Sequence, residues 1–340
     1  MNAPVLKPRQ PKDYATDQEV RWCPGCGDYA ILKAVQRTLA DIAADPARTV
    51  FVSGIGCAAR FPYYIETYGF HTIHGRAPAV ATGIKLANPE LDVWVVGGDG
   101  DMLSIGGNHL MHALRRNVDL TILLFNNEIY GLTKGQYSPT SRIGTRSPST
   151  PGGSIDRPVS ALRLALGAGA RFVARGIDTQ QKVLPDILKR AHAHKGTALV
   201  EIIQNCIVYN DGAFAGFTDR AVEADAQIHV EHGAPLLFGK DRRKGLRLAA
   251  GGLAIEAVSL DEEGVEEGQI LIHDQTNAML ATLLAMLEPP MPVAVGVLFD
   301  SPAPTYDAAV RAQEETERAR AGTPDLNALL RRGPTWTMPG

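Results

Sequence analysis

The chain has 340 residues, of which 45% are hydrophobic and 21% charged, with a formal net charge of −3. This is the composition of a globular protein, without the positive charge that makes nucleic acid a main partner. No segment approaches the roughly 20 apolar residues that a membrane-spanning helix needs, and residues 1–20 contain no apolar signal core. We therefore expect neither a membrane nor a nucleic acid as partner, and we predict a cytoplasmic location.

The first two thirds of the chain alternate between short apolar runs and amphipathic segments. Ile31, Val35 and Leu39 recur at helical spacing, whereas residues 49–53 form a short apolar run typical of a buried strand. Strands that alternate with helices form βαβ units and a parallel sheet, so the predicted fold class is α/β with a mainly parallel sheet flanked by helices. We predict helices over 28–42, 76–87, 105–116, 158–167 and 180–194, and strands over 49–53, 91–97, 119–125, 171–174 and 198–204.

The pattern weakens in the last third of the chain. We predict strands over 270–273 and 293–298, a helix over 277–287, and an extended final segment from Pro302 that lies over the surface or over a partner. Residues 137–158 are rich in Ser, Thr, Pro and Gly, and a loop of this length is usually functional or mobile. We predict an N-terminal arm (1–20), a main domain (21–225) and a less regular C-terminal extension (226–340) that packs on the domain or on a partner subunit.

Polar residues follow two neighbouring predicted strands. Asp99 and Asp101 lie in GGDGD after the first strand, and Asn126 and Asn127 lie in FNNEIYG after the second. Ligands bind beyond the carboxyl ends of the strands in open α/β sheets, so both segments can face one site. An aspartate, an asparagine and a backbone carbonyl suit Mg²⁺, which leaves its other positions to phosphate oxygens and water. Gly, Asp and Asn also dominate ordinary turns, so only the ordered pair of motifs favours a diphosphate site.

The two motifs belong to a longer pattern. GDG followed by NN resembles the fingerprint of thiamine diphosphate enzymes, and NNEIYGLTKGQ, with GIGCAAR and HGRAPAVATG upstream, resembles the β subunit of the 2-oxoacid:ferredoxin oxidoreductases over about residues 21–218. The resemblance implies a thiamine-diphosphate-binding fold for the main domain (21–225) and a reversible oxidative decarboxylation of a 2-oxoacid with coenzyme A, which gives an acyl-CoA and passes electrons to ferredoxin. It also implies an α subunit, which supplies the glutamate that activates the cofactor and the coenzyme A site.

The resemblance assigns roles to individual residues. Magnesium would be bound by the Asp99 carboxylate, the Asn127 side-chain oxygen and the Ile129 backbone carbonyl. The catalytic candidates are His74, Arg60 and Leu132, although His74 taken alone fits a hydrogen-bonded core histidine equally well. The residues expected to border thiamine diphosphate are Ile55, Gly56, Cys57, Ala58, His74, Gly100, Asp101, Gly131 and Leu132.

The chain contains four cysteines, Cys23 and Cys26 in CPGC and the isolated Cys57 and Cys206. Thiolates are the usual ligands of iron–sulfur clusters, and the resemblance makes these four the ligands of one 4Fe-4S cluster. Spacing alone leaves two alternatives open. Four thiolates also suit a structural zinc site, although zinc ribbons usually carry two CxxC pairs. A CxxC pair before a helix also fits a redox-active thiol pair, which leaves Cys57 and Cys206 without a role.

The substrate of such an enzyme is a 2-oxoacid. Arg60, Arg76 and Lys134 lie near the expected cofactor site and could meet a substrate carboxylate, although a single cation is more often solvated or structural. RWCPGCGDYAIL resembles the 2-oxoglutarate branch more than the pyruvate branch, which predicts 2-oxoglutarate as substrate and succinyl-CoA as product. Relatives often carry lysine at the position of Arg60, and the two cations are not interchangeable. Rival hypotheses are a pyruvate or broad 2-oxoacid enzyme, a non-redox thiamine enzyme with structural zinc, and a non-catalytic cofactor-bearing subunit.

Overall fold

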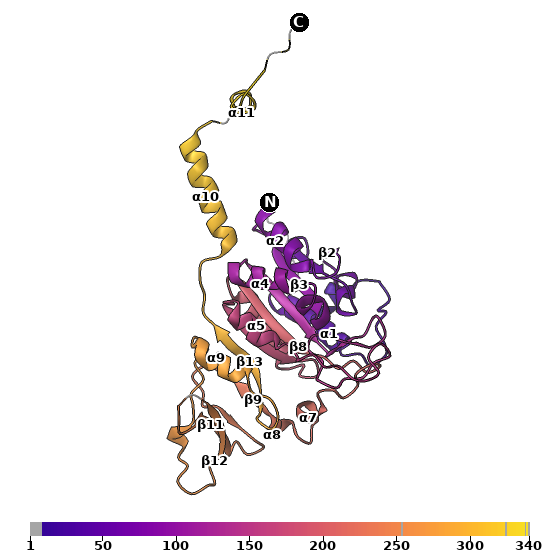
Figure 1. Cartoon of the computed structure of the whole chain (residues 1–340), viewed down its shortest axis with the longest axis vertical. Helices are drawn as coiled ribbons and strands as arrows, with labels where there is room; N and C mark the ends of the chain where they lie inside the picture. Colours follow the sequence, from indigo (N-terminus) through magenta and orange to yellow (C-terminus); the bar gives the residue numbers. More distant parts are fainter. Residues whose placement is uncertain (1–8, 253, 324, 337, 339–340) are drawn as a thin grey trace, which may run out of the picture.

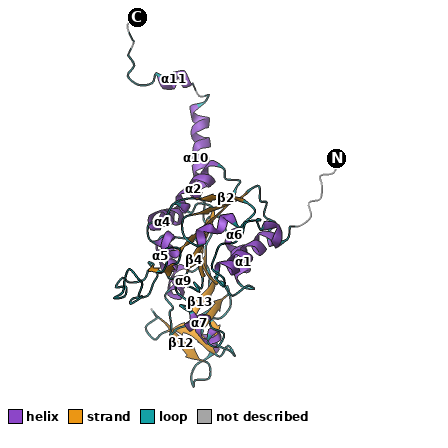
Figure 2. Cartoon of the chain, turned by 90° about the vertical axis from the view of Figure 1, so that its right-hand side faces the viewer, coloured by secondary structure: helices purple, strands orange, loops and turns teal. Residues whose placement is uncertain are grey.

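The centre of the molecule is an eight-stranded sheet with the strand order β2-β1-β3-β4-β8-β7-β13-β9 (Figure 2). The structure is a computed structural model, and it describes residues 9–252, 254–323, 325–336 and 338. Neighbouring strands are parallel except β13 and β7, so the predicted mainly parallel sheet is confirmed. The strands of this sheet are β1 (Thr49–Ser53), β2 (Tyr68–His71), β3 (Asp92–Gly98), β4 (Leu120–Asn126), β7 (Phe172–Ile177), β8 (Thr197–Ile203), β9 (Gln227–Val230) and β13 (Val293–Asp300).

Helices cover both faces of this sheet (Figures 1 and 2). The first face is covered by α1 (Asp28–Asp41) and α6 (Leu184–Ala193), which pack against each other. The second face is covered by α2 (Ala77–Ala87), α4 (Gly107–Arg116), α5 (Ala161–Gly167) and α9 (Ala278–Ala285). The helices predicted over these segments are thus present.

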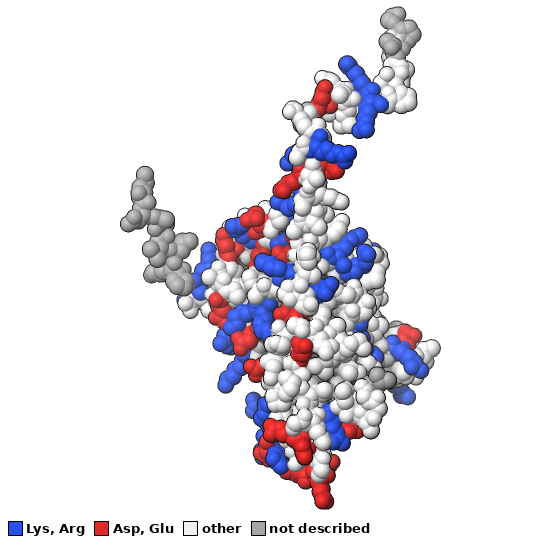
Figure 3. Space-filling view, turned by 90° about the vertical axis from the view of Figure 1, so that its left-hand side faces the viewer, with Lys and Arg blue, Asp and Glu red and all other residues white. Residues whose placement is uncertain are grey.

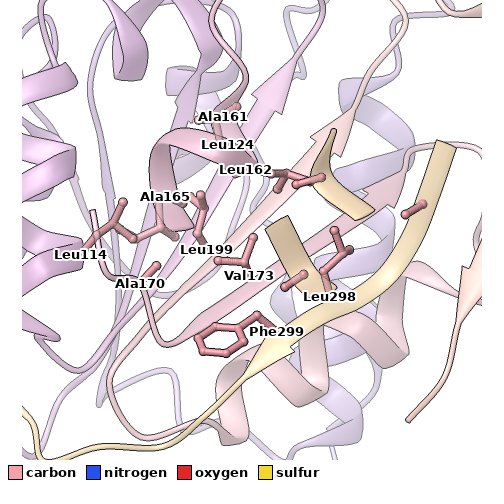
Figure 4. Packing of buried hydrophobic residues seen from close by; sticks show 14 of the residues in the cluster. Leu114, Leu124, Ala161, Leu162, Ala165, Ala170, Val173, Leu199, Leu298 and Phe299 are labelled. Carbon is pink, nitrogen blue, oxygen red and sulfur yellow. The ribbon is translucent and has the colours of Figure 1, made fainter. Parts of the chain in front are cut away.

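The strands are buried on both faces because apolar side chains occupy successive positions. Val50 and Val52 of β1 pack under α2 and α4, whereas Phe51 between them packs on the side of α1. Successive side chains of a strand point to opposite faces, so a near-continuous apolar run fills both layers. The cluster on the second face continues across β7, β8 and β13, where Val173, Leu199, Leu298 and others meet α5 (Figure 4).

Two strands from beyond residue 226, β9 and β13, complete the sheet. β13 and α9 confirm the strand and helix predicted over 293–298 and 277–287. The strand predicted over 270–273 is wrong, because these residues form only an isolated bridge between Pro235 and Ile272. Ile270 instead packs against Gly245 of a small antiparallel sheet. That sheet consists of β10 (Leu237–Phe238), β11 (Lys244–Leu248) and β12 (Ile255–Ser259). The same part of the chain contains three short helical turns: α7 (Ala215–Thr218), α8 (Glu223–Ala226) and η3 (Glu267–Gln269). The division of the chain at residue 226 stays a prediction.

The prediction of an extended final segment is also wrong. Residues from Tyr306 form the helix α10 (Tyr306–Ala321), which projects from the body and is followed by α11 (Leu326–Leu330) (Figure 1). The Thr305 hydroxyl caps α10 by accepting the Ala308 N–H at 3.3 Å, and the segment is rich in Ala, Glu and Arg, which favour helices. No helix in the described ranges is long and apolar enough to cross a membrane.

Residues 1–8 of the predicted N-terminal arm lie outside the described residues, and the rest of the arm packs on the body. Its 3₁₀ turn η1 (Pro11–Tyr14) buries Tyr14 completely, and the Tyr14 hydroxyl donates to the Ala44 carbonyl at 2.6 Å. On the face shown in Figure 3, positive and negative side chains are interspersed, and acidic side chains gather at the lower end. This face carries no continuous basic field of the kind that binds nucleic acid.

Candidate functional site

The carboxyl ends of β1, β3 and β4 border a cavity of about 110 Å³, which we name the cofactor cavity. Its walls come from the segment after β1, from the short helix α3 (Asp99–Leu103) after β3, and from the segment after β4. Every residue that the sequence assigned to thiamine diphosphate or magnesium lines this cavity: Ile55, Gly56, Cys57, Ala58, His74, Asp99, Gly100, Asp101, Asn127, Ile129, Gly131 and Leu132. The structure brings these residues together, and their individual roles stay predictions.

Asp99 is the first residue of α3 and is almost completely buried. Its Oδ2 atom accepts hydrogen bonds from the hydroxyls of Ser138 and Thr140, each at 2.5 Å. Burial raises the pKa of Asp99 above its ordinary value, although these two hydroxyl hydrogen bonds lower it. A buried carboxylate that lines a cavity and has one oxygen held by two donors fits a magnesium ligand, because the cation would compensate the buried charge.

Asp101 connects α3 to the segments that follow β1 and precede α2. Its Oδ1 atom accepts the backbone N–H of Gly75 at 2.8 Å and of Ile55 at 3.3 Å. Its Oδ2 atom is buried and lacks a hydrogen-bond partner within the described part of the chain. Burial raises the pKa of Asp101, while the two backbone hydrogen bonds lower it. This carboxylate therefore holds two cavity walls together and keeps one oxygen available.

A short hairpin closes the cofactor cavity on the side of β4. It consists of β5 (Ile129–Tyr130) and β6 (Gln136–Tyr137), which pair antiparallel. The Asn127 amide is fixed at both ends, because its Oδ1 accepts the Ile129 N–H at 3.1 Å and its Nδ2 donates to Gln204 at 2.7 Å. The Tyr130 hydroxyl donates to the Gly100 carbonyl at 3.1 Å. A Cβ atom at Gly100 would lie 2.1 Å from the Tyr130 ring, so only glycine permits this approach.

All four cysteines line a second cavity, of about 190 Å³, which we name the cysteine cavity. The Cys26 N–H donates to the Cys23 carbonyl at 3.0 Å and closes the CPGC turn. A Cβ atom at Gly131 would lie 3.5 Å from the Cys206 sulfur and 3.6 Å from the Cys57 sulfur, so these sulfurs approach one point of the hairpin. Among the described residues, no three Cys, His, Asp or Glu side chains converge closely enough to hold a single metal ion.

The four cysteines are free thiols. Burial, together with the nearby Asp28 carboxylate, raises the pKa of the Cys57 thiol to about 12. The same two causes raise the pKa of Cys26. Metals bind thiolates, so a metal centre here must displace these protons and supply the charge that stabilises the buried sulfurs.

The two cavities share one wall. Asp28, Cys57, Asn127, Gly131 and Leu132 line both the cofactor cavity and the cysteine cavity. Asp28 is buried at the start of α1, and its Oδ2 atom lacks a partner within the described residues. Burial raises the pKa of Asp28 to about 7, although a hydrogen bond with Cys26 lowers it. A group bound in one cavity would therefore lie beside a group bound in the other.

Three cations stand at different places around these cavities. Arg60, in the 3₁₀ turn η2 (Ala58–Tyr63), lines the cysteine cavity and also a third cavity of about 500 Å³ that Leu132 and Gly56 share. Lys134 lines the cysteine cavity. Arg76 is not among the residues that line the three cavities, and its guanidinium donates to the carbonyls of His74 and Ile105, each at 3.3 Å. The structure thus leaves Arg60 and Lys134 near the candidate site and gives Arg76 a loop-fixing role.

Sequence reasoning missed several residues that build the site. Asp28, Tyr130 and Gln204 line the cavities, and Ser138 and Thr140 bind Asp99. The only signal in the sequence was the position of Asp28 directly after CPGC and that of Tyr130 inside NNEIYG. Ser138 and Thr140 belong to a segment whose composition predicts a loop, and composition does not reveal which side chain a loop hydroxyl meets.

Comparison with known proteins places the chain in a family. A family model described as "Thiamine pyrophosphate enzyme, C-terminal TPP binding domain" matches residues 54–202, which contain most of the cofactor cavity. The chain is 48% identical over 338 residues to the 2-oxoglutarate oxidoreductase subunit KorB of Mycobacterium tuberculosis, a match that covers 98% of this chain and 89% of that protein.

Other relatives match a smaller part. The chain is 50% identical over 198 residues to the β subunit of 2-oxoacid:ferredoxin oxidoreductase 1 of Aeropyrum pernix, which covers 58% of this chain and 62% of that protein. Among solved structures, the 2-oxoglutarate:ferredoxin oxidoreductase of Magnetococcus marinus aligns with a TM-score of 0.77 and 33% identity over 98% of both chains. The expected fold and family are confirmed: the chain is a thiamine-diphosphate-binding member of the family of 2-oxoacid:ferredoxin oxidoreductase β subunits.

Proposed function

We propose that this chain is the cofactor-bearing β subunit of a 2-oxoglutarate:ferredoxin oxidoreductase. The reaction is the oxidative decarboxylation of 2-oxoglutarate with coenzyme A to succinyl-CoA and CO₂, with electrons passed through a 4Fe-4S cluster to ferredoxin. The observation that carries the proposal is the wall shared by the cofactor and cysteine cavities, formed by Cys57, Gly131 and Leu132 among others. Adjacent cavities let a redox centre accept electrons directly from the carbon centre at which the 2-oxoacid reacts.

The cofactor cavity fits thiamine diphosphate and magnesium. Asp99, Asn127 and the Ile129 carbonyl would bind magnesium, since carboxylate, amide and carbonyl oxygens are the ligands it prefers. Thiamine diphosphate, when bound, supplies the carbanion chemistry of decarboxylation, and the protein orients it and excludes water. His74 borders the cavity and is proposed to orient the substrate, and Leu132 covers the cofactor from the hairpin side.

The cysteine cavity fits a 4Fe-4S cluster held by Cys23, Cys26, Cys57 and Cys206. Four sulfurs that surround a cavity of about 190 Å³ suit a polynuclear cluster, which is bound at its corners. The free thiols also suit a reducing compartment, and we propose a cytoplasmic location.

The choice of 2-oxoglutarate rests on the relatives and on Arg60. The M. tuberculosis relative is named a 2-oxoglutarate oxidoreductase subunit, and the M. marinus structure is described with 2-oxoglutarate, coenzyme A and succinyl-CoA bound. We propose that the Arg60 guanidinium binds a substrate carboxylate at the junction of the cysteine cavity and the large outer cavity. The relatives from Aeropyrum pernix and Saccharolobus solfataricus are named only for 2-oxoacids, so a broad 2-oxoacid specificity that includes pyruvate is the second candidate.

The chain requires a partner subunit in this proposal. The carboxylates that line the cofactor cavity within the described residues are Asp28, Asp99 and Asp101, and none of the lining residues there is a glutamate. An α subunit is proposed to supply the glutamate that activates the cofactor, together with the coenzyme A site. The isolated chain, loaded with thiamine diphosphate and its cluster, is therefore expected to be inactive.

The test is reduction of a low-potential dye by the chain produced anaerobically with its genomic partner subunit. The assay contains magnesium, thiamine diphosphate and coenzyme A, and compares 2-oxoglutarate with pyruvate. Faster reduction with 2-oxoglutarate supports the proposal, and equal rates support the broad specificity. No reduction with either substrate, from protein that contains the bound cofactor, iron and acid-labile sulfide, would overturn it. Zinc in place of iron would instead support the non-redox alternative.

A further inference from the structure

The beginning of the long loop after β6 folds back onto the predicted magnesium site. β5 and β6 pair antiparallel, with Ile129 opposite Tyr137. This pairing places Ser138, the residue after β6, beside Glu128, the residue before β5. The Ser141 hydroxyl then donates to the Glu128 carbonyl, and the Ser138 N–H donates to the Ser141 hydroxyl at 2.7 Å. The segment Ser138–Ser141 is therefore fixed to the strand end.

This segment presents two hydroxyls to one carboxylate oxygen. Ser138 Oγ and Thr140 Oγ1 both lie 2.5 Å from Asp99 Oδ2, and all three residues are at most 4% exposed. Thr140 Oγ1 also lies 3.0 Å from Asn126 Oδ1. A hydroxyl has only one hydrogen, and the shorter contact to a charged acceptor is the stronger hydrogen bond. Both hydroxyl hydrogens are thus directed to Asp99.

Asn126 extends this arrangement into the sheet. Its Nδ2 donates to Glu201 Oε1 at 2.8 Å, and Arg175 Nε donates to Glu201 Oε2 at 2.7 Å. Arg175 and Glu201 are cross-strand neighbours in β7 and β8, and their side chains are 11% and 3% exposed. The wall behind Thr140 is therefore held by a buried ion pair, which limits the movement of the hydroxyl.

We propose that Ser138 and Thr140 are positioning residues of the metal site, which hold Asp99 Oδ2 so that Asp99 Oδ1 is presented to magnesium. The proposal rests on the proposed function, because it takes Asp99 as the magnesium ligand. Groups that hydrogen-bond to metal ligands fix the orientation of those ligands, and their loss typically reduces metal affinity. The loop after β6 thereby acts on the cofactor without touching it.

The experiment measures the affinity of the anaerobic complex for Mg²⁺ in the presence of thiamine diphosphate, by titration calorimetry and by the signal of Mn²⁺ used in place of Mg²⁺. We expect Thr140→Val and Ser138→Ala each to weaken metal binding by about 10- to 100-fold. Thr140→Ser retains the hydroxyl and should bind as the unmodified chain does. Thr150→Val, on the same loop but outside this network, is the matched control.

The outcomes separate this proposal from the proposed function. Unchanged metal affinity in Thr140→Val and Ser138→Ala, together with loss of binding in Asp99→Asn, would overturn the positioning role alone. Unchanged affinity in Asp99→Asn would show that the metal site itself is misassigned. Failure of both hydroxyl variants to fold, seen by circular dichroism, would also contradict the proposal, because the hydroxyls would then be structural.

Discussion

The two ends of the central sheet carry similar charged residues but use them differently. At the amino end, a polar cavity of about 270 Å³ contains Lys85, Asp119, Asp92 and His192. Lys85 Nζ lies 2.9 Å from Asp119 Oδ2, and His192 Nε2 lies 3.1 Å from Asp92 Oδ2. At the carboxyl end, the two buried carboxylate oxygens without partners in the described chain belong to Asp28 and Asp101.

The contrast also appears in the pKa values. Burial acts to raise the pKa of Asp119, but the hydrogen bond and charge of Lys85 hold it below its ordinary value. Burial raises the pKa of Asp101, and its two backbone hydrogen bonds and the charges of His74 and His71 offset this rise only in part. Charged groups that satisfy one another stabilise the fold, whereas a buried carboxylate oxygen that lacks a partner, on a residue that lines a cavity, is a candidate contact for a ligand. Residue type alone therefore does not identify a functional site.

The largest expected effect at the carboxyl end is that of Cys57→Ser. Since Cys57 lies in the wall between the two cavities, its loss should remove the cluster and all dye reduction while thiamine diphosphate still binds. Iron and acid-labile sulfide per chain, measured anaerobically, check this, with Val208→Ala on the rim of the cysteine cavity as control. A variant that keeps full iron and activity would contradict the assignment of the four cysteines.

Asp99→Asn is expected to have the next largest effect. It should weaken Mg²⁺-dependent binding of thiamine diphosphate by more than about 100-fold, since loss of a direct ligand exceeds the loss of a group behind it. The melting temperature of the cofactor-free chain should stay close to that of the unmodified chain, because burial disfavours the charge that the substitution removes. Titration calorimetry and thermal unfolding measure both quantities, and the exposed Asp241→Asn is the control.

Lys85→Met changes the amino end of the sheet and should leave the affinity for thiamine diphosphate unchanged. It removes the partner of Asp119 and should cost about 2 kcal/mol of unfolding free energy, below the roughly 3–5 kcal/mol of a fully buried pair because Asp119 is partly exposed. The unmodified Asp119 has a lowered pKa when folded, so its contribution is present at neutral pH and is lost as the pH falls through that folded pKa. Urea unfolding at several pH values would show this. A change in thiamine diphosphate affinity would mean that the amino end of the sheet also acts on the cofactor site, contrary to the difference between the two ends described above.

The smallest effect is expected for Glu90→Ala, also at the amino end. Arg48 and Glu90 are 2.9 Å apart, but their side chains are 54% and 76% exposed. Such pairs contribute less than about 0.5 kcal/mol in most cases, because solvent screens them. Urea unfolding should therefore give the same midpoint as the unmodified chain within error. A loss of unfolding free energy as large as that in Lys85→Met would mean that solvent exposure does not determine how much the two ion pairs contribute to stability.

Much of the fold follows from the sequence because buried parallel strands have a strong signature. TVFVS and DLTILLF are mostly apolar runs, and the polar residues that follow DVWVVGG and DLTILLF had to lie at one edge of a parallel sheet. The C-terminal errors have a different cause. α10 has no apolar stripe and only Asp307 of it is buried, so hydrophobic periodicity could not reveal it. The run at 270–273 is apolar because it packs on the small sheet, not because it is a strand.

The residues of the candidate site that belong to sequence motifs could be predicted. The residues that join the site only through contacts in the folded chain could not. The ends of predicted strands indicated Asp99 and Asn127. The presence of only four cysteines in the chain indicated the cluster ligands. Ser138 and Thr140 meet Asp99 only because the β5–β6 hairpin reverses the chain. The partnerless oxygens of Asp28 and Asp101 result from packing, which no sequence pattern records.

We propose that the two adjoining cavities hold a cofactor and a cluster that exchange electrons. The most direct measurement is the absorbance and electron paramagnetic resonance of the anaerobic complex after addition of 2-oxoglutarate without ferredoxin or dye. We expect reduction of the cluster, with bleaching of its visible absorbance and appearance of a paramagnetic signal, and we expect Cys57→Ser to abolish both. A complex that contains thiamine diphosphate, iron and sulfide but stays oxidised with every 2-oxoacid, in the presence and absence of coenzyme A, would contradict it.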